Sequence, residues 1–318
     1  MKKVLILMEL NAAQREKLEA AGAGAVLRFS LPDRVSEDEV QQADIIIGQP
    51  KAEMIRASER LELLQLESAG ADAYIVPGVL NEKTVLTNAT GAYSQAVAEH
   101  AFALTLMLQK KLHLYRDRQR AARWQDLGAV SSLAGSTVAV VGLGDIGGYY
   151  ARLVKAMGAY VIGVKRRPGP CPDYADELVL TEKLDKVLPR ADVIMSVLPN
   201  TSATQYIYTE ESFRHMKDSA IFINCGRGNA VASGTLYEAL SRGEIAAAGI
   251  DVTEEEPLPE NSPLWSLENL IITPHVSGGH HLPATVDRIV DICAENLRAF
   301  LRGEKLKNVV DFSTGYKR

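Results

Sequence analysis

A short apolar run followed directly by three spaced glycines constrains the fold of this chain most. The segment reads VAVVGLGDIG, with Gly142, Gly144 and Gly147 in a G-x-G-x-x-G pattern. The first glycine permits a tight turn, the second lets a ligand approach the backbone, and the third lets a helix pack closely on the strand. Free N–H groups at the start of such a helix attract phosphate. The segment therefore predicts a Rossmann-type dinucleotide-binding turn, with Asp145 and Ile146 at the helix start.

The rest of the chain alternates short apolar runs with helical patterns, which is typical of parallel sheets covered by helices. In the first part of the chain we expect strands at Val4–Leu7, Ile45–Ile47, Leu63–Leu66 and Val85–Thr87. Later strands are expected at Thr137–Val141, Tyr160–Val164, Val193–Val197, Ala220–Asn224, Ala247–Asp251 and Leu270–Thr273. Helices are expected over Asn11–Ala21, from Ser94 to about Arg120, over Tyr149–Met157 and over Pro283–Arg302. The helix from Ser94 is long enough to connect two domains.

Length and composition favour a two-domain globular enzyme. The chain has 318 residues, 47% of them hydrophobic and 24% charged, and single cores stop growing at about 250–300 residues. A net charge of −5 argues against a nucleic-acid-binding surface. The opening MKKVLIL is expected to be a buried strand, because no small-residue cleavage site of a signal peptide follows it. No apolar run approaches a membrane span, and three scattered cysteines indicate neither disulfides nor a zinc site, so we expect a cytoplasmic protein without metal.

The residues after the second strand of the Rossmann unit indicate which dinucleotide is bound. An acidic residue about 20 positions after the glycines would bind the ribose 2′-hydroxyl of NAD. This chain carries Lys165, Arg166 and Arg167 there instead. Three cations favour the 2′-phosphate of NADP(H) over NAD(H), although a solvated basic loop is the alternative interpretation.

Three further segments, each just past an expected strand, carry residues suited to catalysis. Arg227 lies between two glycines, where its guanidinium could bind a carboxylate as a two-pronged fork. Glu256 ends a run of three glutamates before Pro257, and His275 follows Pro274. Taken singly, such a histidine or glutamate run is more often a solvated loop than a site. The order and combination of the segments make them informative.

With this order and spacing, the chain resembles the D-isomer-specific 2-hydroxyacid dehydrogenase family, and in particular its glyoxylate/hydroxypyruvate reductases. The resemblance covers nearly the whole chain and is strongest from Gly91 to Val310. It implies that Arg227 orients the substrate carboxylate and polarises the carbonyl. It also implies that His275 donates a proton during reduction and that Glu256 is the acidic partner of this histidine. The hydride comes from the nicotinamide cofactor.

Other site residues follow from the same resemblance. The backbone N–H groups of Ala69 and Gly70 would hold the substrate carboxylate, and Thr90 and Ala96–Glu99 would line the nicotinamide side. Cofactor contacts are further implied at Leu198, Pro199, Thr204, Cys225, Arg227, Asp251, His275 and Gly278, with Asp251 binding the carboxamide. Substrate-pocket candidates from both lobes are Leu10, Gln49, Tyr74, Trp265 and His281.

The family architecture implies two doubly wound α/β lobes with the site in the cleft between them. A Rossmann-type cofactor lobe, residues 98–282, would be inserted into a flavodoxin-like substrate lobe of residues 1–97 and 283–318. Family members are commonly dimers through the cofactor lobe, so a homodimer is expected.

The favoured function is reduction of a small 2-keto acid, such as glyoxylate or hydroxypyruvate, to the D-2-hydroxy acid. Formate dehydrogenases of the family usually carry glutamine where Glu256 stands, which argues against formate, whereas phosphite oxidation stays open. A cofactor-sensing regulator, like the corepressor members of the family, is a non-enzymatic alternative. We expect this chain to lack the partner-binding extensions of those members. His280 and His281 are interpreted as a solvated loop, with a pocket or metal role as the alternative.

Overall fold

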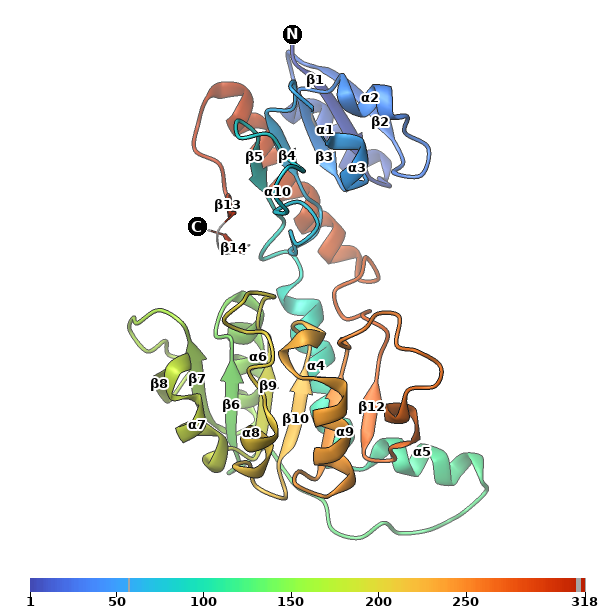
Figure 1. The fold of residues 1–318 in the computed structure, drawn as a ribbon, viewed down its shortest axis with the longest axis vertical. Coiled ribbons are helices and arrows are strands. Elements are labelled where there is room, and N and C mark those ends of the chain that lie inside the picture. Colours follow the sequence, from blue (N-terminus) through green and yellow to red (C-terminus); the bar gives the residue numbers. More distant parts are fainter. Residues whose placement is uncertain (57, 313–315, 318) are drawn as a thin grey trace. The chain divides into compact units, whose positions relative to one another are not determined.

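The computed structural model describes residues 1–56, 58–312 and 316–317, and the chain divides into two compact units. Unit 1 comprises residues Met1–Tyr93 and His280–Arg318, and unit 2 comprises Ser94–Gly279 (Figure 1). The boundaries expected from the sequence, 97/98 and 282/283, lie a few residues further along the chain. Each unit is built on its own parallel sheet with helices on its faces, which confirms the predicted fold class.

The five strands of the unit 1 sheet are all parallel, in the order β2-β1-β3-β4-β5. This is the flavodoxin-like order, in which the direction of winding reverses between β1 and β3. The strands are β1 (Lys3–Leu7), β2 (Val26–Ser30), β3 (Ile45–Gly48), β4 (Leu63–Gln65) and β5 (Val85–Thr87). The helices are α1 (Ala12–Ala21), α2 (Glu37–Gln41), α3 (Ala52–Ile55) and α10 (Pro283–Arg302), and the short strands β13 (Val310–Asp311) and β14 (Tyr316–Lys317) pair with each other.

Local sequence signals explain where the main helices of unit 1 begin and end. The side chain of Asn11 accepts a hydrogen bond from the Gln14 N–H, and the Gln14 side chain accepts one from the Asn11 N–H, which forms a capping box for α1. Helix α10 begins at Pro283 and ends before Gly303, whose φ of 70° suits glycine. Both helices match the predicted ones, and they pack against each other.

The seven strands of the unit 2 sheet are parallel as well, in the order β12-β11-β10-β9-β6-β7-β8. The chain starts in the middle at β6, winds outward through β7 and β8, and then crosses back to β9, so the winding reverses beside β6. The strands are β6 (Thr137–Val141), β7 (Tyr160–Lys165), β8 (Glu177–Leu180), β9 (Val193–Ser196), β10 (Ile221–Asn224), β11 (Ala247–Ile250) and β12 (Leu270–Ile272). The α-helices are α4 (Ser94–Gln109), α5 (Leu112–Arg120), α6 (Asp145–Ala156), α7 (Leu184–Val187), α8 (Glu210–Arg214) and α9 (Ser233–Ser241).

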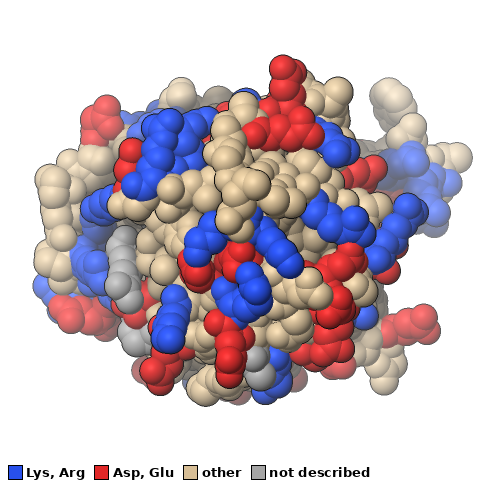
Figure 2. Space-filling view, turned by 90° about the horizontal axis from the view of Figure 1, so that it is seen from above, with Lys and Arg blue, Asp and Glu red and all other residues tan. Residues whose placement is uncertain are grey.

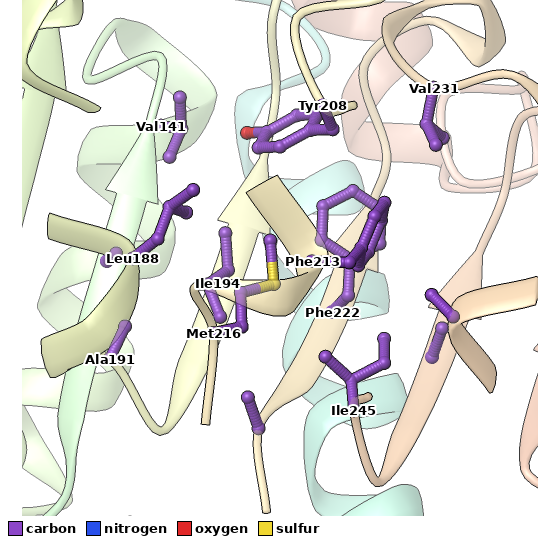
Figure 3. Close-up of a cluster of buried hydrophobic side chains, with 14 of the residues drawn as sticks. Val141, Leu188, Ala191, Ile194, Tyr208, Phe213, Met216, Phe222, Val231 and Ile245 are labelled. Atoms are coloured by element: carbon purple, nitrogen blue, oxygen red, sulfur yellow. The ribbon is translucent and has the colours of Figure 1, made fainter. Parts of the chain in front are cut away.

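One face of this sheet is covered by a large apolar cluster, shown in Figure 3. Phe222 of β10 lies at its centre, and its ring makes edge-to-face contacts with Tyr208 and Phe213 at centroid distances of 4.9 and 5.5 Å. Val141 of β6 and Ile194 of β9 belong to the same cluster. Because these strands are buried on both faces, they show the continuous apolar runs from which they were predicted.

The predicted helix from Ser94 to about Arg120 is wrong in one respect, because it breaks into α4 and α5. Lys111 takes a left-handed conformation with a φ of 54° at the break. The ammonium groups of Lys110 and Lys111 donate to the carbonyls of Ser131 and Leu127, which lie in the loop that follows α5. The break between α4 and α5 is therefore accompanied by long-range contacts of lysine side chains. No glycine or proline in the sequence indicates it.

The outer surface carries charges of both signs. Figure 2 shows Lys and Arg side chains interspersed with Asp and Glu side chains over the face it presents. In the part of the chain that the structure describes, no helix is long and apolar enough to cross a membrane. The same residues contain no cluster of three or more His, Cys, Asp or Glu side chains that could hold a metal ion.

Candidate active site

The predicted site residues of unit 2 gather at one edge of its sheet. They follow the carboxyl ends of parallel strands, where ligands bind in open α/β folds. Gly142 follows β6, Leu198 follows β9, Arg227 follows β10, Glu256 follows β11 and His275 follows β12, while β7 ends at Lys165. The sheet order thus places the glycine turn beside the reversal point and the catalytic candidates on the neighbouring strands β10 to β12.

The glycine turn fits a dinucleotide sterically. Gly142 has a φ of 101°, and a Cβ on it would lie 2.7 Å from the Val197 carbonyl oxygen. A Cβ on Gly147 would lie 2.4 Å from the Gly142 oxygen, whereas one on Gly144 would meet no described atom within 4 Å. Gly144 is also the N-cap of α6 and provides no side-chain cap to the N–H groups there. These groups and the open space beside Gly144 suit a pyrophosphate, with Asp145 and Ile146 in the first turn of the helix.

The cations at the end of β7 reach solvent. Lys165 is half-buried, and Arg166 and Arg167 are exposed. None of the three makes an ion pair with a described carboxylate, although many other exposed Arg and Lys residues of this chain do. The three side chains therefore keep their charge available for an external anion.

Hydrogen bonds to its backbone and a close approach at Gly228 fix the turn that carries Arg227. The Asn224 side chain donates to the Arg227 carbonyl at 3.1 Å and accepts from the Gly226 N–H at 3.1 Å. A Cβ on Gly228 would lie 1.8 Å from the Thr253 oxygen, so only glycine allows this close approach. The Arg227 guanidinium is half-buried and donates to the Gly226 carbonyl at 3.0 Å. The backbone around Arg227 is thus packed closely against Thr253, at the start of the loop that carries Glu256.

His275 and Glu256 form the predicted pair. Nδ1 of His275 lies 2.7 Å from Oε2 of Glu256, and both side chains reach solvent. The other carboxylate oxygen of Glu256 accepts a hydrogen bond from the Thr253 N–H at 3.0 Å. His275 has a φ of 51°, and its N–H donates to the Asp251 carbonyl at 2.8 Å. A non-glycine residue in this conformation needs such support from its surroundings.

Asp251 supports the histidine loop, a role that the sequence did not reveal. Its buried carboxylate accepts hydrogen bonds from the Thr273 hydroxyl at 2.6 Å and from the N–H groups of Val276 and Ser277 at 3.0 Å each. His100 on α4 lies 3.0 Å from the same Thr273 hydroxyl. Asp251 therefore connects the Thr273 side chain before His275 with the backbone after it, and its predicted contact with the carboxamide stays a prediction.

Glu254, interpreted from the sequence as a plain loop residue, anchors the Glu256 loop. Its carboxylate accepts the N–H of Ser233 at the start of α9, and also the hydroxyl of Tyr206 at 2.8 Å. Hydrogen bonds from Ser233 and Tyr206 lower the pKa of Glu254. It thus remains a charged acceptor at neutral pH. Glutamates with different functions can be adjacent in sequence, and only their partners distinguish them.

The other cofactor candidates of unit 2 line the same edge. Cys225 is buried, and burial raises the pKa of its thiol, so it is not a nucleophile at neutral pH. Thr204 donates its hydroxyl to the Pro199 carbonyl at 2.6 Å and thereby closes the loop after β9. Leu198 is buried, and Gly278 is half-buried in the loop that follows His275. The structure thus places them along the strand ends, and their contacts with a cofactor stay predictions.

In unit 1, the loop after β4 offers two free backbone donors. The carbonyls of Ser68, Ala69 and Gly70 accept hydrogen bonds from the Ala89 N–H, the Asn88 side chain and the Ser68 hydroxyl, respectively, at 2.7–2.9 Å. Among the described residues, the N–H groups of Ala69 and Gly70 have no acceptor. Such a loop is suited to bind a carboxylate. Thr90 supports it, since its hydroxyl donates to Asn88 at 2.7 Å.

The remaining candidates for the substrate pocket differ in their exposure and in their hydrogen bonds. Tyr74 is buried and donates its hydroxyl to the Pro50 carbonyl, and exposed Trp265 donates to the Pro259 carbonyl at 2.9 Å. Leu10 and Gln49 follow β1 and β3 of unit 1, and His281 is exposed. His280 lies 3.9 Å from the carboxylate of Glu67, a residue that the sequence analysis did not single out.

Comparisons with known proteins show to which family the chain belongs. Residues 102–277 match the model of the D-isomer specific 2-hydroxyacid dehydrogenase NAD-binding domain. A glyoxylate reductase of Korarchaeum cryptofilum is 32% identical over 82% of this chain and 79% of its own. The crystal structure of a D-isomer specific 2-hydroxyacid dehydrogenase family protein from Aeromonas salmonicida superposes with a TM-score of 0.87 at 33% identity, over 98% of this chain and 99% of that one.

A further structure of this kind contains a cofactor. The D-isomer specific 2-hydroxyacid dehydrogenase of Xanthobacter autotrophicus, solved in complex with NADPH, has a TM-score of 0.83 at 26% identity, over 99% of both chains. The fold, the matching family model and these relatives lead to one conclusion. The chain belongs to the D-isomer specific 2-hydroxyacid dehydrogenase family and is an NAD(P)-dependent enzyme of that class.

Proposed function

We propose that the enzyme reduces a small 2-keto acid of the glyoxylate or hydroxypyruvate type to the D-2-hydroxy acid. The observation that carries this proposal is the 2.7 Å contact between His275 and Glu256 at the sheet edge where Arg227 and the glycine turn also lie. A histidine whose Nδ1 faces a carboxylate is held in one orientation, which leaves Nε2 to exchange a proton with a substrate. A proton donor and an arginine at the same edge of the sheet suit the reduction of a carbonyl next to a carboxylate.

Each residue then has a separate task. The guanidinium of Arg227 binds the substrate carboxylate and polarises the carbonyl. His275 donates the proton that the carbonyl oxygen takes up, and Glu256 fixes the imidazole. When bound, the nicotinamide cofactor supplies the hydride. The N–H groups of Ala69 and Gly70 add hydrogen bonds to the substrate carboxylate.

We infer further that NADP(H) is preferred over NAD(H). Lys165, Arg166 and Arg167 stand where the adenosine ribose is expected, and none is paired with a described carboxylate. A hydrogen bond to a charged group contributes about 1.5–3 kcal/mol, so two contacts with a 2′-phosphate would shift the preference 100-fold or more. The NADPH complex of the Xanthobacter autotrophicus relative is consistent with this preference.

We also infer a homodimer, formed through the arm, defined here as residues 112–130. Its helix α5 has no buried residue, and in Figure 1 the arm extends from the sheet of unit 2. The Trp124 side chain is fully exposed, and Leu112 and Val130 are about half exposed. An open hollow of about 650 Å³ lies beside Trp124 and is lined by Tyr115 and Arg118. Exposed aromatic and apolar side chains together are typical of an interface, and a second copy of the chain offers the complementary arm.

Initial rates with glyoxylate, hydroxypyruvate, pyruvate and bulkier 2-keto acids, each with NADPH and with NADH, test the function. The wild-type enzyme should oxidise NADPH with at least one of them, and the His275→Ala variant should lose 10²–10⁴-fold in rate. The matched control is His215→Ala, which removes an exposed histidine at the end of α8 and should keep wild-type rates. More than a tenth of the activity in His275→Ala would contradict the role of this histidine. Turnover of none of the keto acids would contradict the proposed reaction.

A further inference from the structure

Glu67 is a largely buried carboxylate for which the fold provides no hydrogen bond. It follows β4 and immediately precedes the Ser68–Gly70 loop. Its side chain is only 12% exposed, and Oε2 lies 3.9 Å from Nε2 of the half-exposed His280. Among the described residues, no donor hydrogen-bonds to this carboxylate, and neither oxygen is sealed from solvent. The carboxylate therefore reaches solvent, and in sequence it precedes the loop whose Ala69 and Gly70 N–H groups have no acceptor among the described residues.

The titratable neighbours of Glu67 in unit 1 do not satisfy its charge. Tyr93 donates its hydroxyl to the backbone carbonyl of Glu67 at 2.6 Å, and Tyr74 donates its own to the Pro50 carbonyl at 2.7 Å. Burial and the Glu67 charge raise the pKa of Tyr74 to about 12, and the pKa values of Tyr93 and Cys293 even further. These three groups stay neutral at physiological pH. His280 is thus the one described titratable group within ion-pair distance of Glu67.

A largely buried carboxylate without a hydrogen-bond donor lowers the stability of the fold. Burial raises the pKa of Glu67 to about 7, because the charged form is poorly solvated there. An apolar residue would pack at the end of β4 without this penalty. A carboxylate is also an unfavourable neighbour for a loop that binds an anion, unless it contacts another part of the same ligand. The position of Glu67 therefore points to recognition of the substrate.

We propose that Glu67, with His280 beside it, is a specificity-determining residue that contacts the side chain of the 2-keto acid. It favours substrates that carry a hydrogen-bond donor, a hydroxyl or an ammonium group, on the carbon next to the carbonyl. It disfavours substrates that carry a second anionic group there. This inference rests on the proposed function, because it requires the substrate carboxylate to lie on the Ala69 and Gly70 N–H groups.

Three keto acids that differ in one substituent test the proposal. Hydroxypyruvate carries a hydroxyl on C3, pyruvate a hydrogen and oxaloacetate a carboxylate, so kcat/KM should fall in this order. In the nearly isosteric variant Glu67→Gln, the ratio of kcat/KM for hydroxypyruvate over oxaloacetate should fall at least tenfold, mainly through KM. The matched control is Glu82→Gln, which neutralises an exposed glutamate of the same unit and should leave the ratio unchanged.

The pH dependence tests the wild-type enzyme without any substitution. The carboxyl groups of the substrates stay ionised between pH 6 and 8, whereas Glu67 loses its proton in this range. The preference for hydroxypyruvate over oxaloacetate should therefore rise from pH 6 to 8 in the wild type and stay flat in Glu67→Gln. The variant His280→Ala keeps Glu67 and should keep most of the rise.

The outcomes separate this inference from the reaction on which it rests. A wild-type ratio that does not change with pH, or an unchanged ratio in Glu67→Gln, would overturn the role of Glu67 while leaving keto-acid reduction intact. Turnover of none of the three substrates by the wild type would instead contradict the proposed function itself.

Discussion

Two contacts hold His275 in place, one to its imidazole and one to its backbone. Nδ1 contacts Glu256 at 2.7 Å, and the histidine backbone is fixed by its hydrogen bond to the Asp251 carbonyl. Nε2 has no partner among the described residues and is the nitrogen that can meet a substrate oxygen. The contact with Glu256 therefore decides which nitrogen donates the proton.

The basic residues after β7 allow a test of cofactor choice. Replacing Arg166 and Arg167 together with serine should raise the KM for NADPH about 100-fold and change the KM for NADH less than threefold, because only NADPH carries the 2′-phosphate. Steady-state kinetics with each cofactor at saturating keto acid measures both values. Serine at Arg214 and Arg242, two exposed arginines of unit 2 that pair with glutamates, is the control. An equal loss for both cofactors would show that the basic run does not contact the phosphate.

At the residue scale, sequence reasoning found the groups that stand in motifs and missed those defined by distant partners. The contact between Glu256 and His275 spans 19 residues and was expected from the family resemblance. The cofactor contact of Asp251 stays a prediction, whereas the hydrogen bonds of its carboxylate with the histidine loop were not expected from the sequence. Glu67 was not predicted as a site residue, because its burial and its proximity to His280 arise only in the folded unit. A carboxylate that ends a buried apolar strand directly before a glycine-containing loop is the signal that could have found it.

Among the elements of the two parallel sheets, all central strands and the edge strands β5 and β12 were predicted, whereas the other two edge strands were not. Strands β6, β7 and β9 are continuous apolar runs, because both of their faces are buried. Strands β2 and β8 were not expected from the sequence, and both lie at the edges of their sheets and are only partly buried. Edge strands bury less apolar surface and show a weaker pattern. The break between α4 and α5 was missed for a different reason, since it depends on contacts with the loop after α5.

The loop after β11 should depend on Glu254 and not on its neighbour Glu255. Glu254→Ala removes two hydrogen bonds, from Ser233 and Tyr206. The variant should lower kcat about threefold to tenfold, because the loop that carries Glu256 becomes more mobile. Dissociation constants for NADPH, from fluorescence titration, should change less than twofold. Glu254→Gln keeps an acceptor oxygen and should restore part of the rate.

Glu255→Ala is the matched control, since the side chain of Glu255 is exposed and no described donor binds it. Its kcat should equal that of the wild type. Equal losses in the Glu254 and Glu255 variants would show that the loop is not anchored through Glu254. The lowered pKa of Glu254 means that its contribution to stability is complete above its unfolded value and is lost as the pH falls through the folded one.

For the whole molecule, unit 2 is a continuous stretch of chain inserted between the two parts of unit 1. The family resemblance predicted this insertion in outline. The arm was not predicted, because the sequence does not show that α5 buries none of its residues.

A dimer through the arm should depend on its exposed apolar side chains. Wild-type protein should have about twice the chain mass of 34.6 kDa in light-scattering or sedimentation experiments. Replacing Trp124 and Leu112 together with serine should shift it toward monomer, because both apolar side chains would leave the interface. Trp265→Ser removes an exposed tryptophan outside the arm and is the control. A variant that remains dimeric would place the interface elsewhere.

The most direct test of keto-acid reduction by this enzyme follows the hydride itself. The wild-type protein is incubated with hydroxypyruvate and NADPH that carries deuterium at C4 of the nicotinamide, on the face from which transfer occurs. The product is then analysed by chiral chromatography and mass spectrometry. The expected product is D-glycerate with one deuterium at C2. Unlabelled product, or the L enantiomer, would contradict it.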